Sequence, residues 1–255
     1  MTRYFLGLVL LVTPALGQDL FTPALKQYGK TIKITSPIVV KSGDSIDGRL
    51  SSGKFTRYVA DRKLMGDGSQ KESQKPMFIL EPGATLSNII LDTPSADGVH
   101  IIVANGKTTR LTNIQVRDVG EDALTIKSGS GGNVIISRCS FLKAADKVVQ
   151  INAVTNLVID ECYGQNFGRF ARTTGTGPNL DYRVSISNSG FRNGNSILKM
   201  TNSKSRGELK NVIYEDIDTP VIAENGAKAD LDNVSENRRR KIRGFVDKIL
   251  SAIEE

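Results

Sequence analysis

Carboxylate and cationic side chains occupy matched positions in successive apolar segments in the middle of the chain. The segments align on four apolar residues, Val99, Leu124, Val149 and Ala171. Two positions earlier stand Asp97, Asp122, Lys147 and Arg169, with Glu121 and Asp146 beside them. One position after the alignment residues stand His100, Thr125, Gln150 and Arg172, and Lys199 has the equivalent position in a fifth segment. If the segments stack as neighbouring strands, equivalent residues lie roughly 4.8 Å apart, and a carboxylate cluster adjoins a cation cluster.

The carboxylate cluster consists of Asp97, Glu121, Asp122 and Asp146. Carboxylates this close repel one another unless a cation lies among them, and a ligand set made only of oxygen atoms selects Ca²⁺ over transition metals. A solvated ladder of alternating charge pairs, with no metal bound, accounts for the same residues. The column by itself does not choose between a Ca²⁺ site and such a ladder.

A Ca²⁺ ion at this position would support chemistry on an acidic sugar, because Ca²⁺ on the carboxylate of a uronic acid acidifies the proton on the adjacent carbon. Lys147 is the candidate base, since we expect it to lie between the Ca²⁺ ligands and two arginines. Nearby positive charge lowers the pKa of a lysine more readily than that of an arginine. Arg172 is the candidate partner of the carboxylate or enolate that develops. Loss of the 4-linked glycosidic oxygen would complete a β-elimination, which needs no histidine.

The composition limits the available chemistry to the same groups. The 255 residues include 34 Lys and Arg, 27 Asp and Glu, one His and two Cys. These His and Cys residues are too few for the usual zinc site, which takes three or four such ligands. The net charge of +7 favours an acidic partner but does not choose among nucleic acid, anionic lipid and acidic polysaccharide.

An internal repeat indicates which elements position these groups. Six apolar residues, one in each of six similar segments, are taken as equivalent. They are separated by 25, 20, 23, 27 and 28 residues, which is a solenoid period. Short apolar alternations separated by Gly, Asn, Asp and Ser predict an all-β, right-handed parallel β-helix (solenoid) rather than a leucine-rich repeat. The residues taken as equivalent are Ile89, Ile114, Val134, Leu157, Val184 and Val212.

From about Ile38 to Lys199 the chain resembles the pectate lyases of polysaccharide lyase family 3. The resemblance lies in several motifs that occur in order and with family-like spacing. The motifs are VVKSGDSIDG (39–48), GDGSQKESQKPMFILEPGATLSNIIL (66–91), ADGVH (96–100), DVGEDALTIK (118–127) and AADKVVQINA (144–153). This resemblance implies a secreted β-helix enzyme that cleaves polygalacturonate (pectate) by Ca²⁺-dependent elimination at alkaline pH.

The resemblance also assigns roles to single residues. It implies that Asp97, Glu121 and Asp122 are Ca²⁺ ligands, with Asp146 as a fourth. Lys147 resembles the base of the family, and Arg172 its substrate-anchoring arginine. Glu72 and Lys127 resemble further active-site residues, and we place Arg169 and Lys127 with Arg172 in substrate binding.

Four positions depart from the family pattern. Ile101 stands where Cys is common, Val116 and Arg117 where Trp and an acid are common, and Arg169 replaces the first Lys of a GK-x-x-R element. A mechanism that uses position 169 as its base would be impaired, whereas one that uses Lys147 would survive. An active lyase, a catalytically impaired β-helix that binds acidic polysaccharide, and a basic nucleic-acid-binding module are therefore the three hypotheses. We favour the lyase, without nucleic-acid or membrane partners and as a monomer.

The two ends of the chain have their own patterns. Residues 1–17 combine Arg3, the apolar run 5–12 and a small-x-small site, which indicates a signal peptide, with a buried N-terminal helix as the alternative. We therefore expect a secreted, extracellular protein whose β-helix domain covers 18–225. Residues 226–255 form a charged C-terminal extension. Apolar residues at helical spacing between Ile242 and Ile253 predict a short helix there, which caps the solenoid or attaches it to pectin through its basic patch.

Four further residues have structural roles or are candidates for modification. Cys139 and Cys162 occupy one column a single coil apart, so a bridge between them and two stacked free thiols are both compatible with the sequence. Asn233 begins the one N-x-S/T sequon, an acceptor for glycosylation in a eukaryotic host. His100 is expected to be a hydrogen-bonded structural residue rather than a catalyst.

Overall fold

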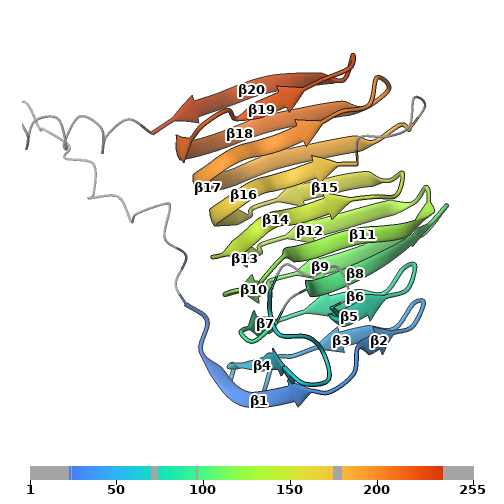
Figure 1. The fold of residues 1–255 in the computed structure, drawn as a ribbon, viewed down its shortest axis with the longest axis vertical. Coiled ribbons are helices and arrows are strands. Elements are labelled where there is room, and N and C mark those ends of the chain that lie inside the picture. Colours follow the sequence, from blue (N-terminus) through green and yellow to red (C-terminus); the bar gives the residue numbers. More distant parts are fainter. Residues whose placement is uncertain (1–22, 24, 70–73, 96, 175–179, 238–255) are drawn as a thin grey trace, which may run out of the picture.

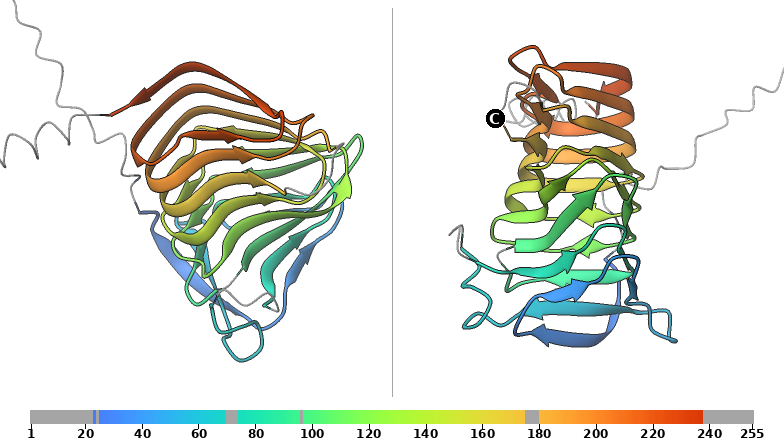
Figure 2. Two further views of the ribbon diagram at one scale, coloured as in Figure 1. Left: turned by 45° about the horizontal axis from the view of Figure 1, so that its top comes forward. Right: turned by 90° about the vertical axis from the view of Figure 1, so that its right-hand side faces the viewer.

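The computed structural model describes residues 23, 25–69, 74–95, 97–174 and 180–237. This part of the chain is a parallel β-solenoid of about eight turns without a helix (Figure 1). Figure 2 shows the same stack from two other directions, with the coils following one another from the N-terminal to the C-terminal side. The all-β, parallel solenoid predicted from the repeat is therefore confirmed.

Each coil contributes strands to three parallel ladders, which we call the first, second and third sheets. The first sheet contains β1 (Tyr28–Ile34), β4 (Phe55–Ala60), β7 (Ile89–Asp92), β10 (Gln115–Val116) and β13 (Ser140–Phe141). The second contains β2 (Ile38–Val40), β5 (Pro76–Leu80), β8 (Asp97–Ala104), β11 (Asp122–Ser130), β14 (Ala144–Ile151) and β19 (Val221–Ala223). The third contains β3 (Ser45–Asp47), β6 (Thr85–Ser87), β9 (Thr108–Thr112), β12 (Asn133–Ser137) and β15 (Asn156–Asp160).

The later strands are long enough to pass from one sheet into the next. They are β16 (Tyr163–Thr173), β17 (Arg183–Met200), β18 (Arg206–Ile217) and β20 (Lys228–Glu236). For example, β17 pairs with β15 through its first residues and with β19 through its last. The coil therefore continues through the bends without a long loop between sheets.

The second sheet has the register expected from the charged motifs. Val99 pairs with Leu124, Leu124 with Val149, and Val149 with Ala171. These alignment residues are buried inside the coils, where a stack of aliphatic and aromatic side chains fills the core. Their outward-facing neighbours are consequently brought into columns along the solenoid.

The wider set of equivalent residues was partly wrong. Val134, Leu157 and Val184 are rung partners in the third sheet, whereas Ile89 and Val212 belong to the first. All three sheets contain strands with buried apolar residues, so a spacing near the coil period does not tell one sheet from another. The short spacing of 20 residues, from Ile114 to Val134, arises because Ile114 directly precedes β10 of the first sheet and Val134 lies in β12 of the third sheet.

A column of residues with positive φ forms the corner between the third and first sheets. Asparagines predominate there, because Asn tolerates the left-handed region better than most residues. Their side chains form a hydrogen-bonded ladder: Asn113 Nδ2 donates to Asn88 Oδ1 at 2.7 Å, and Asn233 Nδ2 donates to Asn211 Oδ1 at 2.8 Å. The column consists of Asn88, Asn113, Arg138, Glu161, Asn188, Asn211 and Asn233, with φ between 48° and 56°.

The cysteines and the chain ends complete the comparison with the sequence. Cys139 and Cys162 are buried free thiols. The sheet continues past residue 225, where we expected the solenoid to end, because β20 pairs along its length with β18. The predicted signal peptide and C-terminal helix lie outside the described residues. No helix of the described ranges is long and apolar enough to cross a membrane.

Completing the asparagine ladder should stabilise the protein. Arg138 and Glu161 interrupt the column at φ 53° and 52°, so the double variant Arg138→Asn/Glu161→Asn gains amide hydrogen bonds and a better left-handed residue at both positions. We expect the melting temperature to rise by roughly 3 to 6 °C in calorimetry. Arg110→Asn, on an exposed strand position of β9, is the control and should give no gain. An unchanged melting temperature in the double variant would contradict the ladder's contribution.

Candidate active site

The outer face of the second sheet bears a cavity of about 300 Å³ across adjacent coils. The register places Asp122, Lys147 and Arg169 on consecutive rungs, and Thr125, Gln150 and Arg172 on the same rungs three residues later. The cavity is lined by Gln74, Asp97, His100, Glu121, Asp122, Thr125, Lys127, Lys147, Gln150, Asn152, Arg172 and Thr174.

Most of the residues predicted for the site meet at this cavity. Asp97, Glu121, Asp122, Lys127, Lys147 and Arg172 all line it. Asp146 and Arg169 lie at its edge, where Arg169 Nη1 is 3.9 Å from Asp146 Oδ1. Glu72 lies outside the described residues.

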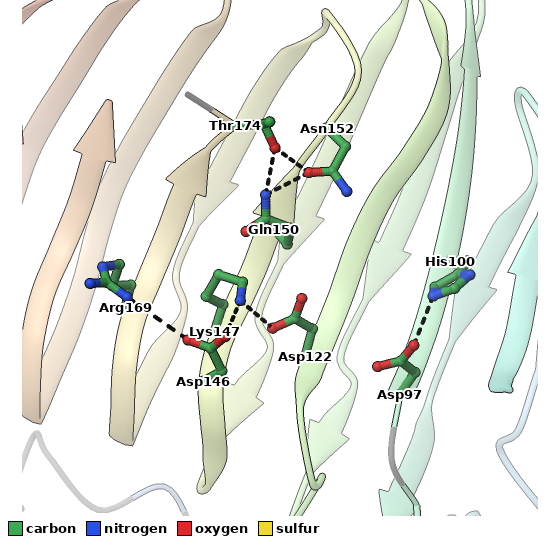
Figure 3. A network of polar contacts seen from close by, with 9 residues as sticks. All are labelled: Asp97, His100, Asp122, Asp146, Lys147, Gln150, Asn152, Arg169 and Thr174. Atoms are coloured by element: carbon green, nitrogen blue, oxygen red, sulfur yellow. Dashed lines mark hydrogen bonds and ion pairs between the residues drawn. The ribbon is translucent and has the colours of Figure 1, made fainter. Parts of the chain in front are cut away.

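Lys147 lies at the centre of a charge cluster (Figure 3). Its side chain is only 9% exposed, its Nζ is 3.3 Å from Asp122 Oδ1, and it donates a hydrogen bond to Asp146 Oδ2. We expected positive charge around this lysine, but its nearest charged partners are these two carboxylates. The position of Lys147 in the site is thus as predicted, whereas its immediate electrostatic environment is different.

Asp122 is the most perturbed acid of the cluster. The pKa of its carboxyl group is raised from 3.8 to about 7, chiefly by burial and to a smaller extent by the negative charges of Asp146 and Asp97, against the lowering effect of Lys147. Buried Asp122 Oδ1 accepts no hydrogen bond within the described structure. Lys147 Nζ, 3.3 Å from this oxygen, compensates the ionised form only in part, and a further cation at this position would favour ionisation.

The donor set fits Ca²⁺ in its chemistry. Asp97, Glu121 and Asp122 line one cavity, and Ca²⁺ prefers carboxylate oxygens. Within the described residues no three acidic, His or Cys side chains already converge as a metal site. Instead, Asp97 Oδ2 is 3.1 Å from His100 Nε2, and Asp122 faces Lys147. Without an ion, His100 and Lys147 are thus the partners of the two carboxylates that would turn toward Ca²⁺.

Several polar residues of the cavity had no predicted role, among them Gln150, Asn152 and Thr174. Gln150 Nε2 donates to Asn152 Oδ1 at 2.5 Å and to Thr174 Oγ1 at 2.8 Å. This leaves Gln150 Oε1 buried without a hydrogen-bond partner in the described part of the chain. Gln150 stood in the aligned column beside Arg172, which was the available signal, but Asn152 and Thr174 join it only through the bend that follows β14 and β16.

Three of the departures from the family pattern lie in the body of the solenoid. Ile101 and Val116 are fully buried in the core. Arg117 packs over the Tyr28 ring, with its Cζ 5.4 Å from the ring centroid, and its Nη2 donates to the carbonyl oxygen of Lys26 at 2.7 Å. These residues stabilise the coil and hold the N-terminal segment on the first sheet. Of the four departures, Arg169 alone borders the cavity.

The comparisons with known proteins point to one family. The sequence profile of the family described as "Pectate lyase" matches residues 22–226. "Probable pectate lyase E" of Neosartorya fischeri is 37% identical over 141 residues, which cover 54% of this chain and 52% of that protein. "Pectate lyase E" of Emericella nidulans is 35% identical over 139 residues, with coverages of 54% and 52%.

The fold and the cavity together define a parallel β-solenoid protein with a cavity lined by charged side chains of both signs. Because the family profile covers most of its length, the chain belongs to the pectate lyase family. The chain spans about half the length of the curated relatives cited above. The resemblance to polysaccharide lyase family 3 is consistent with this membership.

Replacing Asp122 should stabilise the protein when divalent cations are removed. The folded-state pKa of Asp122 is raised to about 7, so the folded protein retains a proton that the unfolded chain releases at lower pH, and stability falls as pH rises from about 4 to 7. In chelator above pH 7, Asp122→Asn should melt roughly 5 °C higher than the wild type, because Lys147 keeps Asp146 as its ion-pair partner. The difference should disappear near pH 4. A lower melting temperature of the variant at pH 8 would show that the buried charge is compensated.

Proposed function

We propose that this protein is a secreted pectate lyase that cleaves de-esterified polygalacturonate by Ca²⁺-dependent β-elimination. The observation that carries the proposal is the buried Lys147 in a cavity that it shares with the carboxylates Asp97 and Asp122 and with Arg172. Family membership supports the reaction class. The acidic polymer accounts for the cations around the cavity, which a neutral polysaccharide would leave unexplained.

Asp97, Glu121 and Asp122 would hold Ca²⁺, with Asp146 as an additional ligand. The bound ion would withdraw electron density from the uronate carboxylate and so acidify the proton at C5. The raised pKa of Asp122 supports this placement, because a bound cation would stabilise the ionised form that burial disfavours. In this arrangement the negative charge that burial penalises becomes the feature that binds the cofactor.

Lys147 is the proposed base and Arg172 the proposed anchor. Lys147 Nζ must lose its own proton before it acts as the base, which would become easier once Asp122 and Asp146 turn from Lys147 to Ca²⁺. It then takes the C5 proton, the electron pair of that bond forms the C4–C5 double bond, and the C4–O bond breaks. The glycosidic oxygen leaves and takes a proton from water. Arg172, whose buried Nε has no hydrogen-bond partner in the described structure, donates to the uronate carboxylate as charge develops on it.

The other cavity residues orient the sugar. Gln150 Oε1 is placed to accept a hydrogen bond from a sugar hydroxyl, since its Nε2 is already held by Asn152 and Thr174. Lys127 is an exposed cation on the cavity wall that would bind a carboxylate. Arg169 contributes charge at the edge, and Glu72 is assigned to the active site by the family resemblance.

The N-terminal pattern of residues 1–17 supports secretion. The proposed lyase domain begins at residue 18 and includes β20, which pairs with β18 beyond the expected end at residue 225. We further infer a monomer without membrane or nucleic-acid partners. Asn233 is the proposed glycosylation site, and its exposed side chain at the last rung of the ladder is compatible with modification.

The reaction is tested by the ultraviolet absorbance of the unsaturated product from polygalacturonate. We expect activity with Ca²⁺, its loss in chelator, and a fall of at least 100-fold in Lys147→Ala because the base is removed. Lys210→Ala, which removes a lysine from the third sheet, is the control and should retain activity. Full activity in chelator would rule out the calcium mechanism. Retention on pectate without any product would identify a non-catalytic binder.

The anchor is tested by Arg172→Lys. A lysine retains the charge but loses the planar pair of donors, so we expect kcat/KM to fall by about 100-fold. Arg169→Lys, at the cavity edge, should fall less than tenfold. Equal effects at the two positions would show that Arg172 contributes charge alone.

A further inference from the structure

The outward-facing row of the second sheet continues beyond the residues of the proposed mechanism. Arg172 of β16 pairs with Lys199 of β17, and Lys199 in turn pairs with Ile222 of β19. Lys199 is therefore the next residue of the row after the proposed anchor, and the row becomes apolar after it. We propose that Lys199 and Glu224 form a further subsite next to the cavity. In this subsite Lys199 binds a uronate carboxylate, and Glu224 competes with that carboxylate for Lys199.

The row places two cations side by side at this point. Strands of one sheet lie roughly 4.8 Å apart, and like charges directly opposite each other are destabilising. The buried Nε of Arg172 has no hydrogen-bond partner within the described ranges. An anionic polymer that crosses both rungs would offer a carboxylate to each of these two cations.

Lys199 already holds a carboxylate of the protein itself. Its Nζ is 3.1 Å from Glu224 Oε1, and the side chains are 19% and 47% exposed. Glu224 comes from the bend after β19, one coil farther along, and reaches back to the lysine. A uronate carries the same functional group as Glu224, so the ion pair shows that Lys199 is able to bind a carboxylate. It also shows what the substrate must displace.

This subsite rests on the proposed function, because the polymer reacts beside Lys147. Polygalacturonate carries a carboxylate on every sugar. If Arg172 holds one sugar and Lys199 holds another, the polymer chain runs along the solenoid toward its C-terminal coils. Lys199 lies beyond Arg172, outside the group of residues around the reacting carbon. It is thus a specificity-determining residue that acts on substrate binding and on the preferred length of the oligomer.

The test measures kcat and KM for galacturonate oligomers of increasing length in Lys199→Met and Glu224→Gln. Loss of one charge-assisted contact should raise KM for long oligomers about tenfold in Lys199→Met, with kcat and the KM of short oligomers retained. Glu224→Gln keeps the shape of the side chain but removes the competing charge, so KM for long oligomers should fall severalfold. Lys210→Met and Asp232→Asn, which alter an exposed ion pair of the third sheet with a separation of 3.6 Å, are the matched controls and should leave KM unchanged.

The outcomes separate the subsite from the proposed function. Opposite shifts of KM in the two variants support the subsite. If the wild type cleaves pectate but neither variant differs from the controls, the subsite is overturned and the lyase stands. If the wild type forms no product, calorimetric binding of the same oligomers replaces the kinetics. Opposite changes in affinity then keep the subsite while the lyase is abandoned, and unchanged affinity overturns both.

Discussion

Parallel pairing between coils is the interaction on which the site depends. Hydrogen bonds between adjacent strands fix the register, so Asp122, Lys147 and Arg169 lie on consecutive rungs although many residues separate them in the chain. The pairing of Val99, Leu124 and Val149 inside the coil sets which side chains face outward beside them. A shift of one residue in one strand would turn its charged side chains into the core, where burial of unpaired charge is costly. The apolar stack therefore holds the charged columns in place.

The same packing buries charged side chains of the cavity, which costs desolvation free energy. Asp122 and Lys147 are nearly buried, and each is more costly alone than as a pair. Their separation of 3.3 Å reduces the cost without removing it, since the pKa of Asp122 stays well above its ordinary value. A carboxylate that is only partly compensated beside a lysine and an arginine does not serve stability alone. The proposed function accounts for it, because a calcium-bound uronate would bring both a cation and an anion to these side chains.

The repeat allowed much of this arrangement to be predicted, because a solenoid converts a sequence offset into a neighbour relation. The second-sheet columns that contain Asp122 and Lys147 were correct for that reason. The equivalence of Val134 with Ile114 was wrong, because the third and first sheets have similar apolar strands and the period alone does not distinguish them. Asn152 and Thr174 were missed because they follow strands at a bend, where sequence spacing no longer indicates direction.

The sequence by itself determined the all-β solenoid, the family resemblance and the set of charged residues along one face, since apolar periodicity and motif order are local properties of the chain. Only the tertiary structure decided which partners those charges have. Lys147 contacts Asp122 and Asp146 rather than two arginines, Lys199 holds Glu224, and the cysteines remain free thiols. The physical reason is that rung register gives the spacing of backbones, whereas side-chain direction, burial and the path of each bend determine which charged atoms meet.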